Sequence, residues 1–521
     1  MALFLNPAAR SMLPRVTGAE SLLRTLASNG IDTCFMNPGT SEMHFVAALE
    51  RVPAMRGYLC LFEGVCSGAA DGYARALNRP AATLLHLGPG LANGLANFHN
   101  ARKARSPVVS IVGQHATQHL KVDAPLTSDV EAFARTVSDA VRVVRSADDV
   151  APSVAETVAA AWGPPGQVAM VIVPADHSWS ETNVSAPPAK RKLPVMPSDG
   201  AIDAARRALR EPGTAILLGG NAVNARALAA ANRTGARVMT ARNVAKIAWG
   251  RSPFTAPQVP YFPEAALPFL ADVKRLILVE TETPVSFFAY PDTPSHMAPD
   301  GCQTIVLARR DEDGTAALAE LAPGPSHASE PQSAAPMPQD GALTLDSLGL
   351  SLACLLPENA LVADEMVSSA GKILAHLGNA APHEFMPVTG GAIGQGLPVA
   401  LGAAVACPDR KVIALEADGS GMYTLQTLWT MARHNLDITI VIFANRRYRI
   451  LDIEMKRTGA DASGAACDAM TDIGTPPLDW IKIAEGCGVA ATRAATVRQF
   501  TDRFSDAMKQ RGPRLIEAAL K

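Results

Sequence analysis

The chain has 521 residues, 48% hydrophobic and 18% charged, so it can bury several cores and is expected to form about three globular domains. Its formal net charge is −2 with both signs well mixed, which argues against nucleic acid or a membrane surface as a partner. No apolar stretch approaches the length of a membrane span, and the eight cysteines show no metal-ligand spacing. Such scattered thiols predict a reducing compartment, the cytoplasm.

Two proline-rich segments divide the chain. Residues 185–199 mix prolines with a basic cluster, and residues 322–342 are rich in Pro, Ala and Ser but poor in large apolar groups. We interpret both as linkers between domains at 16–184, 200–321 and 343–521. Residues 1–15 are expected to be a disordered start.

The first domain alternates predicted strands and helices. Thr17–Glu20 has capping-box spacing and begins a helix expected to end at Gly30, and strands are predicted at IDTCFM, GYLCLF, AATLLH and VVSIVG. This alternation predicts a parallel sheet with right-handed crossovers. Polar residues follow the carboxyl ends of the strands, where open α/β sheets bind ligands: Thr40, Ser41, Glu63, His86, Gln114 and His115.

Glu63 is the most informative of these residues. It follows a predicted apolar strand and precedes a helix of small residues, GVCSGAA, so its side chain is expected to face a close-packed, poorly hydrated space. A carboxyl group there could share a proton with a ligand nitrogen. The alternative is a helix-start acid favoured by the helix dipole.

The middle domain begins again with strand, Gly-rich turn, helix and strand. Its turn, GGNAVNA, does not match G-x-G-x-x-G, so a dinucleotide site is not indicated. A scaffold role is the preferred interpretation.

The last domain contains a strand–helix–strand unit with polar residues at both strand ends. KVIALEA and DITIVIFA are apolar and β-rich, and the segment between them has helical spacing at Leu425, Leu428, Trp429 and Ala432. Adjacent parallel strands would bring Asp418 and Asn445 together at one edge. Both side chains offer hard oxygen ligands suited to Mg²⁺, which completes its shell with water and phosphate oxygens.

The residues after Asp418 strengthen this interpretation. DGSG places backbone N–H groups at a helix start, a cradle for phosphate, so the pattern indicates a metal-bridged diphosphate. The alternative is that Asp418 only caps the helix and Asn445 only turns the chain.

These motifs resemble the thiamine diphosphate-dependent enzymes, specifically the group that contains acetohydroxyacid synthase and benzoylformate decarboxylase. ADGS followed by FAN resembles the G-D-G…N-N cofactor motif, and LFEGVCSGAADGYARA resembles the segment with the cofactor-activating glutamate. NPGTSE and GGAIGQGLPVALGAA also match. The resemblance runs from about Val16 onward and is weakest in the middle domain. It implies an α/β fold of three doubly wound parallel-sheet domains: pyrimidine-binding, middle and diphosphate-binding.

The resemblance implies how thiamine diphosphate would be held. Glu63 would hydrogen-bond its aminopyrimidine ring and favour the imino tautomer that removes the thiazolium proton. The Gly391 carbonyl would receive the amino group, and Ile393 would be the apolar wedge that bends the cofactor. The diphosphate would lie at Gly419 and Ser420.

The resemblance also implies the metal ligands and the assembly. Asp418, Asn445 and the backbone carbonyl of Arg447 would hold Mg²⁺; Ala417 and Ala444 depart from the motif at positions that are not ligands. The family places the pyrimidine and the diphosphate on different subunits. A homodimer or homotetramer with active sites at subunit interfaces is therefore expected.

Departures from the motifs bear on the substrate. His86 matches a catalytic histidine of benzoylformate decarboxylase, and Thr40 matches a substrate-contacting serine. Phe287 and Phe288 stand where that decarboxylase carries its second histidine, so its two-histidine proton relay is not expected. A structural role is the alternative for His86. Gln114 and His115 are further catalytic candidates at the same edge.

Residues 456–474 are small, polar and aperiodic, and we predict that they form a mobile lid; an ordinary surface loop is the alternative.

Together these features predict an enzyme that uses thiamine diphosphate and Mg²⁺ on 2-oxo acids, by decarboxylation or carbon–carbon bond formation, with an acetolactate synthase-like carboligase as first choice. A decarboxylase or lyase of the benzoylformate decarboxylase type is the alternative, and a non-catalytic relative used for assembly or regulation is a different class. FAD is not expected, because the middle domain lacks a dinucleotide fingerprint.

Overall fold

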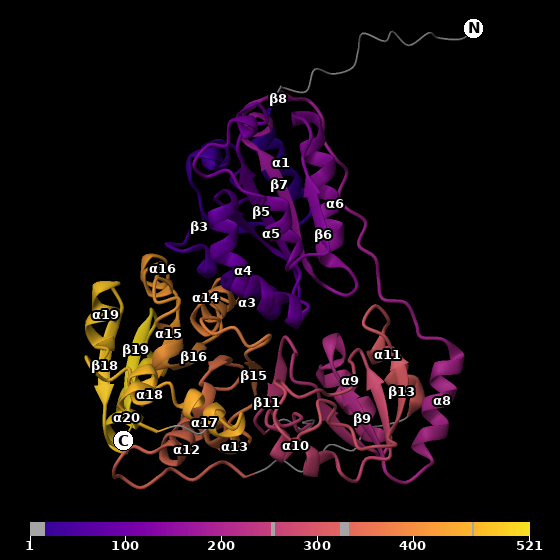
Figure 1. Ribbon diagram of the computed structural model, residues 1–521, viewed down its shortest axis with the longest axis vertical. Helices are drawn as coiled ribbons and strands as arrows, with labels where there is room; N and C mark the ends of the chain where they lie inside the picture. Colours follow the sequence, from indigo (N-terminus) through magenta and orange to yellow (C-terminus); the bar gives the residue numbers. More distant parts are fainter. Residues whose placement is uncertain (1–15, 252–255, 323–332, 461–462, 521) are drawn as a thin grey trace.

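The computed structural model describes residues 16–251, 256–322, 333–460 and 463–520 and shows three α/β units, each built on its own sheet (Figure 1). The predicted disordered start, residues 1–15, and part of the second linker lie outside the described residues. In the described parts of the chain, no helix is both long and apolar enough to span a bilayer. The described cysteines are all free thiols, and three of the eight are buried.

The N-terminal sheet is six-stranded with the order β3-β2-β4-β5-β7-β6, and all its pairings are parallel. Its strands are β2 (Thr33–Asn37), β3 (Arg56–Leu59), β4 (Ala81–Leu85), β5 (Val108–Gln114), β6 (Ala140–Val143) and β7 (Val168–Pro174). One face is covered by α1 (Gly18–Ser28), α2 (Met43–Ala48) and α6 (Val150–Trp162). The other face is covered by α3 (Glu63–Leu77), α4 (Leu87–Ala104) and α5 (Val130–Arg135).

The predicted first helix is confirmed as α1. The Thr17 side chain accepts a hydrogen bond from the Glu20 backbone N–H at 3.2 Å, which satisfies one of the free donors at the helix start. The helix ends before Gly30, whose φ of +76° favours glycine.

The middle sheet is four-stranded and parallel, with the order β10-β9-β12-β13. Its strands are β9 (Thr214–Leu218), β10 (Arg237–Thr240), β12 (Arg275–Val279) and β13 (Gln303–Ala308). Separate cores on its two faces involve α8 (Asp199–Leu209), α9 (Ala225–Arg233), α10 (Pro263–Leu270) and α11 (Gly314–Leu321). The prediction of another α/β unit here is confirmed.

The C-terminal sheet contains β14 (Leu361–Glu365), β15 (His383–Met386), β16 (Val412–Ala417), β17 (Ile438–Ala444), β18 (Ala490–Ala494) and β19 (Arg514–Ala519). Its order is β11-β15-β14-β16-β17-β19-β18. The edge strand β11 (Ile247–Trp249) pairs antiparallel with β15, although its residues lie inside the range predicted for the middle domain. One face packs on α12 (Leu345–Leu355), α13 (Ala370–Leu377) and α20 (Val497–Lys509), the other on α14 (Gly396–Ala406), α16 (Thr427–Arg433) and α19 (Trp480–Gly486).

The N-terminal and C-terminal sheets share one topology. When the six parallel strands of each are numbered in chain order, both read 2-1-3-4-6-5. The helix that follows the second strand, α3 in one case and α14 in the other, makes the main contact between the two units (Figure 1). A Cβ at Gly72 would overlap the Val399 backbone, and one at Gly402 would overlap the Ala69 backbone, so these glycines permit the close approach. A single hydrophobic core continues across this contact.

Two details differ from the predictions. The strand before Glu63 is a short edge strand that ends at Leu59, and its first two residues are exposed, so it is not the apolar strand predicted to run up to Glu63. The segment 456–474 is not aperiodic throughout, because residues 465–471 form α18 (Ala465–Thr471), which begins after Gly464 at two alanines. Movement of this segment stays a prediction, and residues 461–462 lie outside the described residues.

Candidate active site

Strained backbone marks the carboxyl ends of the parallel strands. Four residues other than glycine have positive φ directly after or close to a strand end: Leu87 at +53°, Glu280 at +54°, Val367 at +50° and Arg446 at +58°. Branched and bulky side chains rarely adopt this conformation, and such strain concentrates at functional sites. The observation supports the prediction that this edge of the sheets holds the functional residues.

The C-terminal edge brings Asp418 and Asn445 to adjacent strands, as predicted. Strands β16 and β17 pair in parallel, and the two residues directly follow them. The Asp418 carboxylate accepts the backbone N–H of Arg446 at 2.6 Å and that of Gly419 at 3.0 Å. The Asn445 side-chain oxygen accepts the backbone N–H of Arg447 at 2.9 Å. The turn after β17 therefore fixes the side chains of both Asp418 and Asn445 through its backbone N–H groups.

The chemistry of these donors fits Mg²⁺ and a diphosphate. Burial, at 3% exposure, raises the pKa of Asp418 to about 6, so a bound cation would stabilise its charged form. The described residues contain no cluster of three or more His, Cys, Asp and Glu that could cage a metal ion. A carboxylate and an amide oxygen, completed by phosphate oxygens and water, suit Mg²⁺. Gly419 and Ser420 lie in the short helix α15 (Asp418–Gly421), and a Cβ at Gly419 would overlap the Tyr448 ring.

A glycine-rich segment, residues 387–396, lies between β15 and α14 of the C-terminal unit and contacts the N-terminal unit. Gly390, Gly391 and Gly394 have φ of +71°, +84° and +92°, so only glycine is well suited to these positions. The Glu365 carboxylate accepts the backbone N–H of Gly394 at 2.7 Å and that of Gly396 at 2.6 Å. Ile393, the predicted wedge, is half-buried and Gly391 is exposed, so both are accessible to a ligand.

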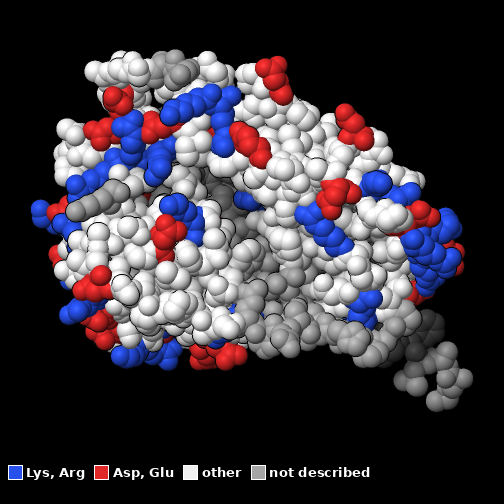
Figure 2. All heavy atoms as spheres, turned by 90° about the horizontal axis from the view of Figure 1, so that it is seen from below, with Lys and Arg blue, Asp and Glu red and all other residues white. Residues whose placement is uncertain are grey.

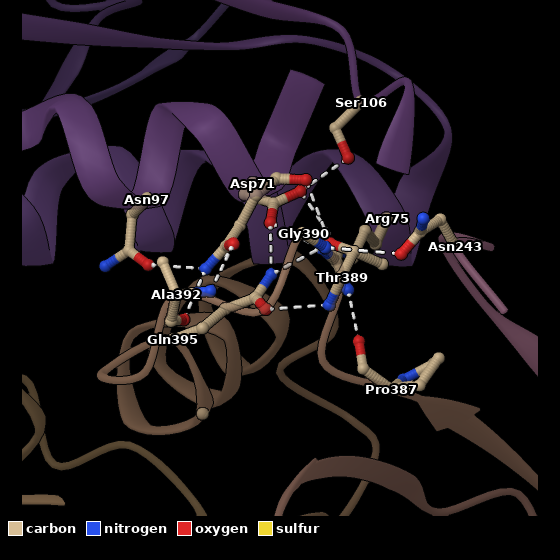
Figure 3. A network of polar contacts seen from close by, with 12 residues as sticks. Asp71, Arg75, Asn97, Ser106, Asn243, Pro387, Thr389, Gly390, Ala392 and Gln395 are labelled. Carbon is tan, nitrogen blue, oxygen red and sulfur yellow. Dashed lines mark hydrogen bonds and ion pairs between the residues drawn. The ribbon is translucent and has the colours of Figure 1, made fainter. Parts of the chain in front are cut away.

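Figure 3 shows how α3 holds this segment. The Arg75 guanidinium pairs with the Asp71 carboxylate at 2.7 and 2.8 Å, and also donates to the Pro387 carbonyl and the Thr389 hydroxyl. The Arg75 and Asp71 side chains are fully buried. Asp71 also accepts a hydrogen bond from the Gln395 amide at 2.9 Å. The segment is thus positioned by the N-terminal unit of its own chain.

On the N-terminal edge, Glu63 is the first residue of α3 and 8% exposed, which confirms the predicted buried position. Its carboxylate accepts a hydrogen bond from the Asn93 side chain at 2.9 Å. An ideal Cβ at Gly90 would lie 2.9 Å from the other Glu63 oxygen. Gly90 of α4 therefore leaves a narrow space beside the Glu63 carboxyl group, which a larger side chain at this position would fill.

His86 lies between β4 and α4, with 23% of its side chain exposed. Its Nδ1 lies 2.7 Å from the carboxylate of Glu42, a residue of the short turn Thr40–Glu42 that follows β2. No hydrogen bond among the described residues involves its Nε2. Thr40 is exposed at the start of the same turn.

Gln114 is the last residue of β5 and His115 follows it, next to Gly113, which packs against Glu42. The Gln114 side-chain oxygen accepts the His115 backbone N–H at 2.8 Å, so Gln114 orients the chain rather than pointing freely outward. The His115 and His119 rings lie 5.3 Å apart, edge to face. Burial, then repulsion from His119 and His86, lowers the pKa of His115, which keeps the ring neutral at higher acidity.

The middle unit contributes an aromatic wall to the C-terminal edge. A Cβ at Gly391 would overlap the Phe287 ring, and Phe287 packs on Tyr261 and Phe288 at centroid distances of 5.0 and 5.1 Å. Phe287 and Phe288 remain 42% and 52% exposed. The Arg447 side chain instead pairs with Asp452 and Asp468, so only its backbone could face a metal.

The middle sheet has its own strand-end carboxylate, Glu280. It accepts the backbone N–H groups of Asn221 at 2.7 Å and Gly314 at 3.1 Å, the latter at the start of α11. Burial raises the pKa of Glu280 to about 7. Its carboxylate therefore lies where the phosphate of a nucleotide would bind in this type of sheet.

Several of these residues were not identified from the sequence: Glu42, Asn93, Glu365 and Glu280. Glu42 carried a signal, because it ends the NPGTSE turn after a strand and three residues after Gly39, whose N–H it accepts at 2.8 Å. Asn93 and Glu365 make their contacts across about 30 residues of sequence, and Glu280 binds only backbone of the middle unit, away from this site.

Surface charge is mixed. On the face seen from below in Figure 2, basic and acidic side chains stand next to one another among a majority of other residues. The absence of a nucleic-acid partner stays a prediction.

Comparison with known families matches both outer units. Residues 16–141 match the thiamine pyrophosphate enzyme N-terminal TPP-binding domain, and residues 368–518 match the C-terminal TPP-binding domain. The first match contains Glu63 and His86, and the second contains Gly391, Asp418 and Asn445.

Two relatives align over nearly the full length. "Putative acetolactate synthase large subunit IlvX" of Mycobacterium tuberculosis is 47% identical, covering 97% of this chain and 99% of the relative. Benzoylformate decarboxylase of Pseudomonas aeruginosa is 28% identical, covering 94% of this chain and 96% of the relative. Among solved structures, a 4-hydroxybenzoylformate decarboxylase of Rhodococcus jostii superposes with a TM-score of 0.83 at 24% identity, covering 97% of this chain and 99% of that one.

Proposed function

Since the chain belongs to the thiamine pyrophosphate enzymes, we propose that it uses thiamine diphosphate and Mg²⁺ to act on a 2-oxo acid, by decarboxylation, carbon–carbon bond formation or both. The observation that carries this proposal is the pairing of Asp418 and Asn445 at the ends of neighbouring parallel strands, beside a helix start. A scaffold would need neither group there, which disfavours the non-catalytic alternative.

Residues of the C-terminal edge would hold the cofactor. Asp418, Asn445 and the Arg447 carbonyl would bind the metal ion, while Gly419 and Ser420 would bind the diphosphate through backbone N–H groups and a hydroxyl. The Gly391 carbonyl and Ile393 would contact the pyrimidine. When bound, the cofactor supplies an electron sink that stabilises a carbanion at the former carbonyl carbon.

Residues of the N-terminal edge would handle protons. Glu63, buried and held by Asn93, would share a proton with the pyrimidine ring. His86 would accept or donate a proton at Nε2, and Thr40, Gln114 and His115 would line the substrate side of the edge. Phe287 and Phe288 would exclude water from the opposite side.

An acetolactate synthase-like carboligase is the first choice between the two reaction types. The 47% identical relative carries that name, and Phe287 rather than a histidine lies against Gly391, which leaves His86 without the second histidine of the decarboxylase pattern. A decarboxylase or lyase remains the second candidate, favoured by the presence of His86 itself and by the 28% identical relative.

We also propose that the protein is a homodimer or homotetramer, with each site formed by the N-terminal edge of one chain and the C-terminal edge of another. Large apolar side chains are exposed beside both edges, among them Met43 at 45%, Leu61 at 48% and Tyr423 at 54%, and a second copy would cover them. Light scattering coupled to gel filtration measures the assembly directly.

The middle unit is proposed to bind no FAD. Glu280 already accepts the backbone N–H groups that would meet a nucleotide phosphate, and two like charges would repel there. The purified protein should show no flavin absorbance, and added FAD should not change its thermal stability.

The function is tested by incubating the protein with thiamine diphosphate, Mg²⁺ and a panel of 2-oxo acids. Carbon dioxide release and coupled products are followed separately, because a carboligase of this type releases CO₂ and forms a coupled product, whereas a simple decarboxylase releases CO₂ and forms an aldehyde. Failure to release CO₂ or to form a coupled product from any 2-oxo acid would contradict the proposal.

A further inference from the structure

Glu42 is a fully buried carboxylate beside the proposed proton-transfer residue. Its exposure is 0%, one of its oxygens lies 2.7 Å from Nδ1 of His86, and the same oxygen accepts the Gly39 backbone N–H at 2.8 Å. Its other oxygen is buried without a hydrogen-bond partner among the described residues. Burying a charged group in this way is costly, so the arrangement calls for a reason beyond stability.

Two glycines make room for this pair. A Cβ at Gly113, at the end of β5, would overlap the unpartnered oxygen of Glu42, and a Cβ at Gly39 would overlap the His86 ring. In addition, Leu87 directly after His86 is buried with a φ of +53°, a strained conformation for leucine. Three separate local features thus fix the position of the carboxylate and the ring relative to each other.

We propose that Glu42 is a positioning residue for proton transfer at His86: its carboxylate accepts the Nδ1 hydrogen and so leaves Nε2, on the partly exposed side of the ring, free to take up a proton. This inference rests on the proposed function, because it assigns His86 the proton-transfer role. A neutral imidazole donates from one nitrogen and accepts at the other, so a partner that binds Nδ1–H decides which tautomer is present. When Nε2 gains a proton, the adjacent carboxylate stabilises the imidazolium, and the proton returns to the product later in the same turnover.

The electrostatic surroundings are consistent with this role. Burial raises the pKa of Glu42, and the nearby His86 opposes this rise. Glu63 is the other carboxylate on this side, since Gly90 lies between it and His86. His115, which follows β5, is the other histidine whose charge would act on His86, and its ring packs edge to face on His119.

The test compares Glu42→Gln, His86→Gln and the double variant with the parent enzyme, each saturated with thiamine diphosphate and Mg²⁺. Glutamine has nearly the same shape, but it lacks the charge and cannot satisfy both Gly39 and Nδ1 as an acceptor without burying its amide hydrogens unpaired. We expect Glu42→Gln to lower kcat about 100-fold with KM changed less than about threefold, and the acidic limb of the kcat profile to move to lower pH. The double variant should be no slower than His86→Gln alone.

Glu280→Gln is the matched control. Glu280 is also buried and also accepts two backbone N–H groups, but it lies in the middle unit and contacts no histidine. The Glu280→Gln variant should lower the melting temperature about as much as Glu42→Gln does, but it should keep the parent kcat. If both variants lost kcat equally in proportion to their lower melting temperature, Glu42 would be only structural and the inference would be wrong. Multiplying effects in the double variant would also overturn it.

Nitrogen-15 NMR of the histidine side chains gives a readout that needs no turnover. The His86 signal, assigned by its loss in His86→Gln, should show a protonated Nδ1 and an unprotonated Nε2 in the parent protein, and Glu42→Gln should change that pattern. The opposite tautomer in the parent would overturn the inference even if 2-oxo acids are substrates. If no 2-oxo acid reacts but the tautomer is as expected, the positioning contact stands and the proposed reaction fails.

Discussion

The N-terminal and C-terminal sheets have the same strand order but carry different chemistry at the same edge. His86 and Asp418 directly follow the third strand of each sheet, and the fourth strand ends at Gln114 in one sheet and just before Asn445 in the other. The first strand leads in both cases to a buried glutamate, Glu42 or Glu365. One edge therefore presents groups that exchange protons, and the other presents oxygens and backbone N–H groups that bind a cation and an anion. The topology supplies positions, and the residue types decide what each position does.

The two edges also differ in how they are supported. At the C-terminal edge, Glu365 and Asp418 bind backbone N–H groups of the glycine-rich segment and of the turn after β17. At the N-terminal edge, Glu42 accepts one backbone N–H, from Gly39, but Glu42 and Asn93 also hold side chains, those of His86 and Glu63. A site that holds a ligand needs a fixed backbone, whereas a site that moves protons needs fixed side chains.

The largest effect is expected from breaking the connection between the two units. Arg75→Met should lower the free energy of unfolding by about 3–5 kcal/mol, because it leaves the Asp71 carboxylate buried without its partner and frees residues 387–389. Chemical denaturation measures this change. Arg142→Met, which breaks an exposed pair with Glu156 of similar length, should cost less than about 1 kcal/mol. Equal costs would show that the buried network does not support the glycine-rich segment.

Asp418→Ala should remove the metal and the cofactor together. Loss of the only carboxylate proposed as a metal ligand is expected to weaken Mg²⁺ and thiamine diphosphate binding by at least about 100-fold, measured by calorimetry. Asp313→Ala is the control, because Asp313 caps α11 near the edge of the middle sheet and its loss should cost only about 1 kcal/mol of stability. Cofactor affinity unchanged in Asp418→Ala would mean that Asp418 is a cap like Asp313.

Glu63→Gln should separate binding from turnover. The variant keeps the shape of the side chain but cannot exchange a proton with the pyrimidine, so kcat should fall about 100-fold while cofactor affinity changes little. Asp346→Asn makes the same change of charge at an exposed side chain in the first turn of α12, and should leave kcat unaltered. Parent-like turnover in Glu63→Gln would reduce Glu63 to a helix-start acid.

The smallest effect concerns substrate choice. Phe287→Ala should enlarge the space against Gly391 and raise kcat/KM for phenylglyoxylate relative to pyruvate by about tenfold. Phe269→Ala, a change in the same unit at a ring that packs under Arg237, should leave the ratio unchanged. A constant ratio in both variants would place the substrate away from the aromatic wall.

The sequence predicted what depends on local pattern. The apolar runs before Asp418 and after Leu436 identified two strands joined by one crossover helix, and such strands are neighbours in a parallel sheet, so the pairing of Asp418 with Asn445 followed. Glu63 was predicted to be buried because small residues follow it. The roles assigned to these residues stay predictions, as do the domain boundaries.

Contacts that depend on the order of strands or on docking between units could not be predicted. Glu42 reaches His86 only because β2 lies between β3 and β4, and Phe287 reaches Gly391 only because the middle unit packs beside the C-terminal sheet. Similarly, β11 leaves its own unit to extend the C-terminal sheet, and nothing in its three residues indicates that. Side-chain contacts over long sequence separations require the fold to be known first.

The central claim is that one active site combines the N-terminal edge of one chain with the C-terminal edge of another. It is tested by co-expressing Glu63→Gln and Asp418→Ala chains in equal amounts, each inactive alone, and assaying the whole mixture of assemblies without separating the hybrids. Shared sites predict that random assembly restores about a quarter of the parent activity, because half of the dimers are hybrids and each holds one intact site. Hybrids as inactive as the single variants would contradict the claim, since every site would then lie within one chain and carry a substitution.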